Sequence, residues 1–187
     1  MILETIVTTQ NSLGNTHLAP MGIHTNGDGV IILPFRPSTT LENVLETRTA
    51  VINYCDDVRI FAGCLTGRRD WPLQPAEKIT GQVVQGALAH CEVKLLRIED
   101  DPTRPKLFCQ SIHSVNHAPF KGFNRAQYSV LEAAILISRI NWLPLDKIEA
   151  ECAYLKIGLE KTAGEKEWEA WGWLMAVIEN HKKGLNA

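Results

Sequence analysis

Three runs of residues near the start of the chain decide the fold. They read ILETIVTT at positions 2–9, HLAPMGIH at 17–24 and VIILPF at 30–35. Alternating apolar and polar side chains, as in the first run, are typical of a strand with one buried face. The turn TNGDG separates the last two runs, and its Asn-Gly and Asp-Gly steps tolerate positive φ. The three runs are therefore predicted to form an antiparallel meander.

Further elements follow in a mixed order up to about residue 116, and the pattern is helical after residue 124. The predicted elements are a helix at 39–48, a strand at 50–54, a helix at 56–65, a surface excursion at 67–81, and strands at 87–99 and 106–116. The helix after residue 124 has little polar face, which predicts burial against the sheet. Apolar stripes at 145–159 and 168–178 predict an antiparallel helical hairpin. The residues alone thus indicate an α+β protein, a sheet domain with a helical extension.

The composition excludes several classes of function. The 187 residues include 19 Lys and Arg against 21 Asp and Glu, which gives a net charge of −2. Nucleic acid and anionic membranes attract concentrated positive charge, so neither is expected as a partner. No run approaches the roughly 20 apolar residues of a membrane span, and the first residues lack the basic segment of a signal peptide. The protein is therefore expected in the cytoplasm.

Several kinds of catalytic and metal site are not expected. The five cysteines are odd in number and no pair has C-x-x-C spacing, so they are expected to be reduced and mostly buried. His113 and His117 would share a face only on a helix, whereas their surroundings predict strand and loop, so no metal site is expected. The motifs G-x-S-x-G, G-x-G-x-x-G and the Walker loop are absent. Trp168, Trp171 and Trp173 are interpreted as core residues.

The segment PFRPSTTLEN leads from a strand into a helix and is a candidate phosphate-binding loop. The hydroxyls of Ser38, Thr39 and Thr40 stand at the helix start, where free N–H groups attract anions. Arg36 adds a guanidinium, which binds phosphate strongly. In the alternative interpretation, Thr39 and Glu42 only form a capping box and Arg36 is solvated.

Two further segments are candidates for ligand binding. In KGFNRA, Asn124 caps a helix and Arg125 follows it, which makes a second candidate anion site; the alternative is a plain helix cap. In the strand HLAPMG, Pro20 removes a ladder donor and Gly22 removes a side chain. Backbone groups there would be free to meet a flat ligand, and the alternative is an edge strand with a bulge.

Together these segments resemble an uncharacterised family of FMN-binding split-barrel proteins, found chiefly in archaea and in bacteria that use the tetrahydromethanopterin C1 pathway. The resemblance covers most of the chain, from residue 2 to about residue 180. It is carried by ETIVTT at 4–9, HLAPMG at 17–22, RPSTTLEN at 36–43, VINYCDD at 51–57 and GFNRA at 122–126. The family is related more distantly to flavin reductases and pyridoxamine-phosphate oxidases.

The resemblance implies a six-stranded antiparallel split β-barrel at residues 1–122, with a C-terminal α-helical hairpin extension at 123–187 that packs on the barrel as one structural unit. It also implies a homodimer that holds FMN near the subunit interface. The strand would lie along the flavin ring, and the Thr-x-x-Asn segment with its Arg would bind the phosphate. The FMN-binding residues that the resemblance implies are Ala19, Pro20, Met21, Gly22, Arg36, Ser38, Thr39, Thr40, Asn43, Asn124 and Arg125.

The implied function is a flavin-dependent oxidoreductase, linked to tetrahydromethanopterin metabolism. The alternatives are a non-enzymatic FMN-binding or interaction module and a ligand sensor without flavin. One departure is that flavin reductases often place Lys and Asp directly before the Thr, where this chain has Ser38 and Thr39. The substrate, the electron donor and the catalytic residues stay unassigned. The titratable side chains nearest the implied ring site are His17, His24 and Tyr54.

Overall fold

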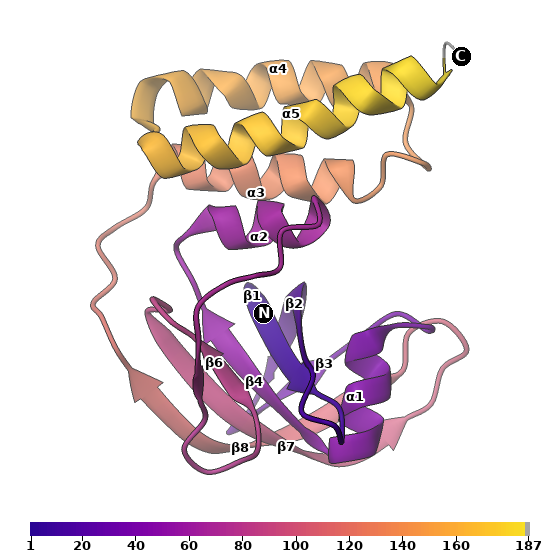
Figure 1. Ribbon diagram of the computed structural model, residues 1–187, viewed down its shortest axis with the longest axis vertical. Coiled ribbons are helices and arrows are strands. Elements are labelled where there is room, and N and C mark those ends of the chain that lie inside the picture. Colours follow the sequence, from indigo (N-terminus) through magenta and orange to yellow (C-terminus); the bar gives the residue numbers. More distant parts are fainter. Residues whose placement is uncertain (186–187) are drawn as a thin grey trace. The chain divides into compact units, whose positions relative to one another are not determined.

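Six strands close into an antiparallel barrel (Figure 1). In barrel order they are β1 (Ile2–Gln10), β2 (Thr16–Asn26), β3 (Gly29–Ile32), β8 (Lys106–Asn116), β7 (Ala89–Glu99) and β4 (Thr49–Tyr54). The computed structural model describes residues 1–185, and the barrel belongs to the first of two compact units, Met1–Cys55 with Asp70–Phe120. The predicted meander and the predicted six-stranded antiparallel barrel are both confirmed.

The outer face of β1 is covered, although its alternating pattern predicted a half-buried strand. All residues from Thr5 to Gln10 are buried. The helix α1 (Thr39–Thr47) and the strand β6 (Gln82–Val84) pack on this part of β1. The hydroxyl of Thr8 donates to the carbonyl of Gln82 there. The polar residues of β1 from Thr5 to Gln10 therefore lie inside the unit, whereas Glu4 is exposed.

The excursion predicted at 67–81 contains regular structure that periodicity could not reveal. Its strand β5 (Leu73–Pro75) pairs with β6 in a separate two-stranded sheet. Asn53 of β4 anchors this sheet, because its amide oxygen accepts the N–H of Val84 at 2.8 Å and its amide nitrogen donates to the carbonyl of Ile6 at 3.0 Å. Strands of three residues are too short to show a period of two.

The interior of the barrel is apolar and contains thiols. Its fully buried side chains include Val7, Ile23, Ile32, Ile52, Val93 and Leu107. Cys91 and Cys109 belong to the same core, and burial raises the pKa of the Cys109 thiol to about 12. Four of the five cysteines are buried and Cys55 is partly exposed. The prediction of mostly buried thiols is confirmed.

The second compact unit is helical and is made of two separate pieces of chain, residues 56–69 and the part after residue 120. It contains α2 (Val58–Leu65), α3 (Arg125–Ile137), α4 (Leu145–Thr162) and α5 (Glu165–Leu185). α4 and α5 run antiparallel and both pack on α3 (Figure 1), so the predicted hairpin is present. The predicted domain boundary at residue 122 would assign residues 56–69 to the barrel domain. In the structure these residues group with the C-terminal helices. No helix within residues 1–185 is long and apolar enough to cross a membrane.

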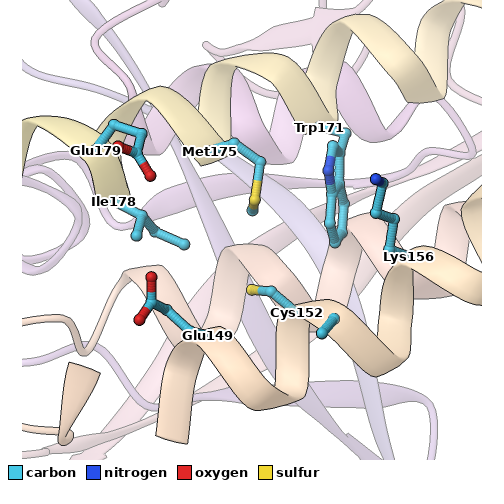
Figure 2. Close-up of a pocket in the computed structure, with 8 residues that line it drawn as sticks. Glu149, Cys152, Lys156, Trp171, Met175, Ile178 and Glu179 are labelled. Carbon is cyan, nitrogen blue, oxygen red and sulfur yellow. The ribbon is translucent and has the colours of Figure 1, made fainter. Parts of the chain in front are cut away.

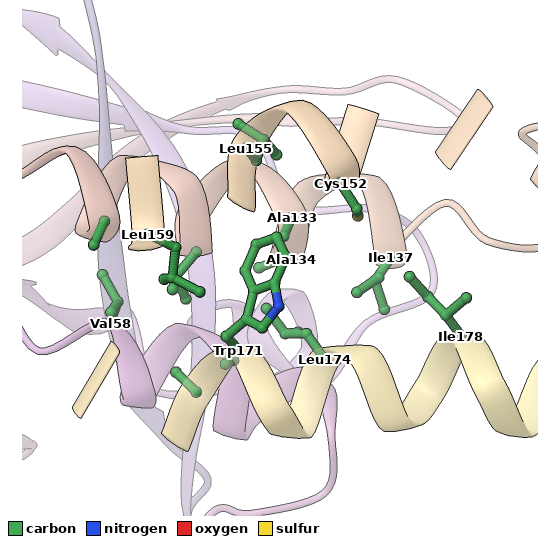
Figure 3. Packing of buried hydrophobic residues seen from close by; sticks show 14 of the residues in the cluster. Val58, Ala133, Ala134, Ile137, Cys152, Leu155, Leu159, Trp171, Leu174 and Ile178 are labelled. Atoms are coloured by element: carbon green, nitrogen blue, oxygen red, sulfur yellow. The ribbon is translucent and has the colours of Figure 1, made fainter. Parts of the chain in front are cut away.

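One apolar core joins the four helices of this unit (Figure 3). Val58 of α2, Leu159 of α4 and Trp171 of α5 are each at most 5% exposed. The buried face of α3 packs in this helical core. Its sequence pattern instead predicted packing against the sheet. Trp171 is a core residue as predicted and Trp173 packs against the core, but Trp168 is 43% exposed.

Candidate functional site

The middle of β2 has a neighbouring strand on one side only. β1 pairs with β2 along residues 16–24. β3 has four residues and pairs only with residues 23–26 of β2. Residues 16–22 therefore present a backbone edge that no strand of the barrel covers. N–H and C=O groups at such an edge are available to a ligand or to another chain.

Pro20 lies on this unpaired edge without a bulge. The N–H of Thr25 bonds to the carbonyl of Met1 at 3.2 Å, and hydrogen bonds alternate along an antiparallel strand. The peptide groups of Leu18, Pro20 and Gly22 consequently point away from β1. The register of β1 with β2 is continuous, so the bulge is wrong; β2 is not an edge strand of the closed barrel, although residues 16–22 are unpaired on one side. Pro20 removes no hydrogen bond from the ladder.

Gly22 is explained by packing within the sheet. A Cβ atom at this position would lie 2.9 Å from Cγ2 of Ile2 and 3.3 Å from Oε1 of Glu4, both on β1. The missing side chain therefore makes room for its neighbours. Ala19 and Met21 are half-buried, and Met21 packs against the barrel core.

The start of α1 presents donors to an anion. The N-cap is Ser38, whose hydroxyl accepts the N–H of Leu41 at 3.3 Å. The capping box predicted to start at Thr39 is wrong by one residue, because Thr39 is already helical while Ser38 has extended backbone angles. In the described part of the chain, the N–H groups of Thr39 and Thr40 have no hydrogen-bond partner. Together with the positive end of the helix dipole, they can bind an anion.

Two of the residues predicted to bind phosphate lie on the buried face of this helix. Thr40 is 2% exposed and Asn43 is 5% exposed. The side-chain amide of Asn43 donates to the hydroxyl of Thr9 at 3.0 Å. Thr9 pairs with His17 of β2, and α1 contacts both β1 and β2. The structure therefore brings the start of α1 beside the unpaired edge of β2.

Arg36 is exposed in the loop before α1. Its guanidinium forms a 2.8 Å ion pair with Asp100, and the two side chains are 40% and 75% exposed. Its backbone N–H bonds to the carbonyl of Thr103 at 2.9 Å, which ties the loop to the turn between β7 and β8. Exposed ion pairs contribute about 0–1 kcal/mol. The guanidinium can therefore exchange Asp100 for a bound anion at little expense in stability.

Asn124 and Arg125 belong to the helical unit. Asn124 is the N-cap of α3, as predicted, and its side-chain oxygen accepts the N–H of Ala126 at 2.7 Å. Its amide nitrogen donates to the carbonyl of Thr162 at 3.1 Å, which joins α3 to the end of α4. Arg125 is the first residue of α3 and is exposed. Its side chain is available to a ligand, whereas the amide of Asn124 is engaged inside the helical unit.

His90 and Glu92 of β7 are buried polar residues that the sequence patterns did not single out. They are 2% and 0% exposed. One carboxylate oxygen of Glu92 accepts the N–H of Glu77 at 2.7 Å, and the other accepts those of Lys78 and Ile79 at 2.7 and 3.0 Å. Burial would raise the pKa of Glu92, but these N–H groups and the His90 ring outweigh it and hold the pKa below its ordinary value. The signal in the sequence was a His and a Glu two residues apart in a strand.

The helical unit contains an apolar groove of about 310 Å³ between α4 and α5 (Figure 2). Cys152, Trp171 and Met175 line it, and the first two also belong to the helical core. At one end Lys182 forms ion pairs with Glu149 and Glu179. The groove thus follows from the packing of both helices on α3.

The fold defines a class of protein, namely a six-stranded antiparallel barrel with an unpaired β2 edge beside a helix start, followed by C-terminal helices. The chain belongs to the family described as protein of unknown function DUF447. The model of the N-terminal domain of this family matches residues 3–118, and a second model matches residues 124–176. No curated protein matches the sequence.

Solved structures share the fold. A crystal structure of an FMN-bound protein from Methanosarcina mazei, assigned to the same family, has 18% identity and a TM-score of 0.81, and the match covers 94% of both chains. The 2-nitrobenzoate 2-nitroreductase of Pseudomonas fluorescens has 23% identity and a TM-score of 0.53 over 61% of this chain and 64% of that one. An NADH:FAD oxidoreductase of Streptomyces globisporus has 12% identity and a TM-score of 0.52 over 61% and 70%. The predicted barrel type with C-terminal helices is confirmed.

Proposed function

We propose that this protein is an FMN-binding flavoprotein that acts as a flavin-dependent oxidoreductase. The observation that carries the proposal is the FMN-bound member of the same family, which has this fold over 94% of the chain. Further support comes from the two other structural neighbours, which are named as a nitroreductase and a flavin oxidoreductase.

The start of α1 fits the phosphate of FMN. The N–H groups of Thr39 and Thr40 are unpaired in the described part of the chain, and the hydroxyl of Thr39 is exposed beside them. Arg36 adds a charged donor whose present partner is an exposed carboxylate. Ser38 caps the helix and Asn43 holds it from beneath, so these two residues position the N–H groups.

The unpaired edge of β2 fits the flavin ring. The polar edge of the ring carries hydrogen-bond donors and acceptors, and the partly exposed peptide groups of Pro20 and Gly22 supply two carbonyl acceptors and one N–H donor along this edge. Bound FMN supplies the electron-transfer chemistry. The chain's own residues bind it and orient it.

We further propose that two copies form a homodimer with FMN near the interface, and that Asn124 and Arg125 contribute to the pocket. Arg125 is exposed, so its guanidinium can reach a ligand held by the other copy, and Asn124 positions it as the N-cap of the same helix. Binding and association would then strengthen each other by mass action. Sedimentation at several protein concentrations, with and without FMN, tests this linkage, and independent titrations would contradict it.

An absorption titration tests FMN binding. The purified protein is stripped of bound flavin, FMN is added back, and flavin absorption that co-migrates with the protein is measured. Arg36→Ala and Thr39→Ala should weaken retention, whereas Arg139→Ala, an equal charge change on an exposed residue of the helical unit, should not. A wild-type protein that takes up no FMN would overturn the proposal.

Reductant screening tests the oxidoreductase role separately. Rapid bleaching of the bound flavin by one donor among NADH, NADPH and a reduced tetrahydromethanopterin would support an enzyme, and bleaching by the pterin would support the link to C1 metabolism. Slow and unselective bleaching by all donors would instead favour the non-enzymatic FMN-binding module.

A further inference from the structure

Three side chains form a hydrogen-bonded chain from the interior of the barrel unit to its surface. Glu92 and His90 lie on the face of β7 opposite the barrel core and are at most 2% exposed. Nε2 of His90 lies 3.4 Å from Oε1 of Glu92, and Nδ1 of His90 lies 2.8 Å from Nε2 of His117. The two imidazole rings are inclined by only 15°, with centroids 5.0 Å apart. The ring of His117 is exposed at the outer end of the chain.

The hydrogen bonds determine where the protons lie. The carboxylate of Glu92 accepts three backbone N–H groups, so it is ionised and acts only as an acceptor. Nε2 of His90 must therefore carry a proton, and in the neutral ring this leaves a lone pair on Nδ1. Nε2 of His117 donates to that lone pair. The unused lone pair of these hydrogen-bonded side chains is then on Nδ1 of His117, at the surface.

Other polar and charged side chains surround these three residues. Glu77 brings a second carboxylate, whose Oε2 lies 3.2 Å from Nε2 of His113. That nitrogen is buried and has no well-oriented hydrogen-bond partner within the described residues, and its ring lies 6.3 Å from that of His90. The β-sheet partners of His90 are neutral, namely Asn53 and Val115. Lys78 and Lys94, the nearby cations, line a separate hollow.

His117, the exposed end of the hydrogen-bonded series, has a fixed backbone and lies beside a hollow. The N–H groups of His117 and Ala118 both bond to the carbonyl of Leu88, at 2.8 and 3.1 Å. Residues 116–120 line a hollow of about 490 Å³. Phe120 also lines it and is 61% exposed. Asn116 and His117 supply the polar groups of this open hollow.

Support of the turn at 77–79 does not by itself require two imidazoles. Glu92 alone anchors the turn at 77–79, and an apolar residue at position 90 would avoid the expense of burying an imidazole. The described residues contain no group of His, Cys, Asp and Glu with the geometry of a metal site. A carboxylate that orients one imidazole and stabilises its cation is instead the arrangement found in acid–base catalysis.

We propose that Glu92, His90 and His117 form a proton relay, and that His117 is an acid–base group for a small molecule bound in the 116–120 hollow. The molecule would be flat and aromatic or conjugated, with an ionisable O–H or N–H group. Its O–H or N–H bond breaks as the proton passes to Nδ1 of His117. The Nε2 proton of His117 moves to Nδ1 of His90, and the conjugate base leaves. The positive charge is then on His90, beside the Glu92 carboxylate. The proposal does not rest on FMN binding.

Nuclear magnetic resonance of protein labelled with ¹⁵N in its histidine rings tests the relay itself. We expect a scalar coupling between Nδ1 of His90 and Nε2 of His117 across their hydrogen bond, and an unprotonated Nδ1 in the neutral ring of His117. His90→Gln should remove the coupling while the spectrum of the barrel backbone is retained. A proton on Nδ1 of His117 with no coupling to His90 would overturn the relay.

The acid–base role is tested with 4-nitrophenol, a flat phenol whose absorption reports ionisation. At mildly acidic pH, excess wild-type protein should ionise the probe, and His117→Gln should abolish this effect. His90→Gln should bind the probe and ionise several-fold less of it, which a merely structural role of His90 would not predict. His181→Gln, in α5, serves as the control and should behave as wild type. A probe left neutral by the wild type, or ionised equally by His117→Gln, would overturn the proposal.

Discussion

The side-chain amide of Asn43 donates a 3.0 Å hydrogen bond to the hydroxyl of Thr9, and this bond ties α1 to β1 directly beneath the proposed phosphate site. Thr9 also pairs with His17 of β2. One buried bond therefore relates the helix start to the strand edge, the two features that the FMN proposal needs together. Asn43 thus has a positioning role that a Thr-x-x-Asn motif alone does not reveal.

Asn43→Ala should lower the free energy of unfolding by about 1–3 kcal/mol, because Thr9 loses its partner in a buried place. FMN affinity should fall only modestly, since the N–H groups of the helix start shift but remain. Urea denaturation and an FMN titration measure the two effects. Glu42→Ala, on the exposed side of the same helix, is the control and should change both little. Loss of FMN binding with unchanged stability would instead place Asn43 on the ligand.

Arg36 and Asp100 should have opposite effects on FMN binding. Arg36→Ala removes a charge-assisted hydrogen bond to the phosphate, and FMN affinity should fall about tenfold or more. Asp100→Asn releases the guanidinium from its 2.8 Å ion pair, so affinity should rise several-fold. Both variants should unfold within about 1 kcal/mol of wild type, because the pair is exposed. Equal losses of affinity in both variants would show that the ion pair, and not the free guanidinium, matters.

Glu92 should make the stability of the protein depend on pH. Its pKa is held low in the folded state by backbone N–H groups despite burial, and an unfolded Glu titrates at about 4.3. Ionised Glu92 therefore stabilises the fold above that pH, and this contribution is lost as the pH falls through the folded-state pKa. Denaturation of Glu92→Gln should show a deficit of about 1–3 kcal/mol at neutral pH that shrinks in acid. A deficit independent of pH would contradict this origin. Glu99→Gln, an exposed carboxylate on the same strand, should give a much smaller deficit.

Most of the fold was predictable because long elements carry a clear period. The runs at 2–9 and 17–24 became β1 and β2, and the stripes at 145–159 and 168–178 became α4 and α5. The strand β5 was missed because three residues show no period and its position depends on its pairing with β6. The burial of both faces of β1 was missed for a related reason, since it is imposed by α1 and β6, elements distant in sequence.

The candidate site was predictable where the signal is local. A helix start after Arg36 and a Pro within a strand are visible in the sequence. Their proximity, however, depends on the bond between Asn43 and Thr9 and on the shortness of β3, which are tertiary facts. His90 and His117 are 27 positions apart and meet only because β7 pairs with β8. A spacing argument confined to His113 and His117 could not find that contact.

The two tryptophans at positions 168 and 171 should differ sharply in their contribution to stability. Trp171 is 5% exposed and lies in the core shared by the four helices (Figure 3), whereas Trp168 is 43% exposed. Trp171→Ala leaves a cavity among Leu159, Leu174 and their neighbours, so the free energy of unfolding should fall by about 3–5 kcal/mol. Trp168→Ala removes the same number of atoms from a partly solvated position and should change the free energy of unfolding by less than about 1 kcal/mol. Thermal and urea denaturation of both variants, followed by far-ultraviolet circular dichroism, measures the difference. Equal losses would show that the side chain of Trp168 is buried in solution, as it would be if a second copy of the chain covered α5.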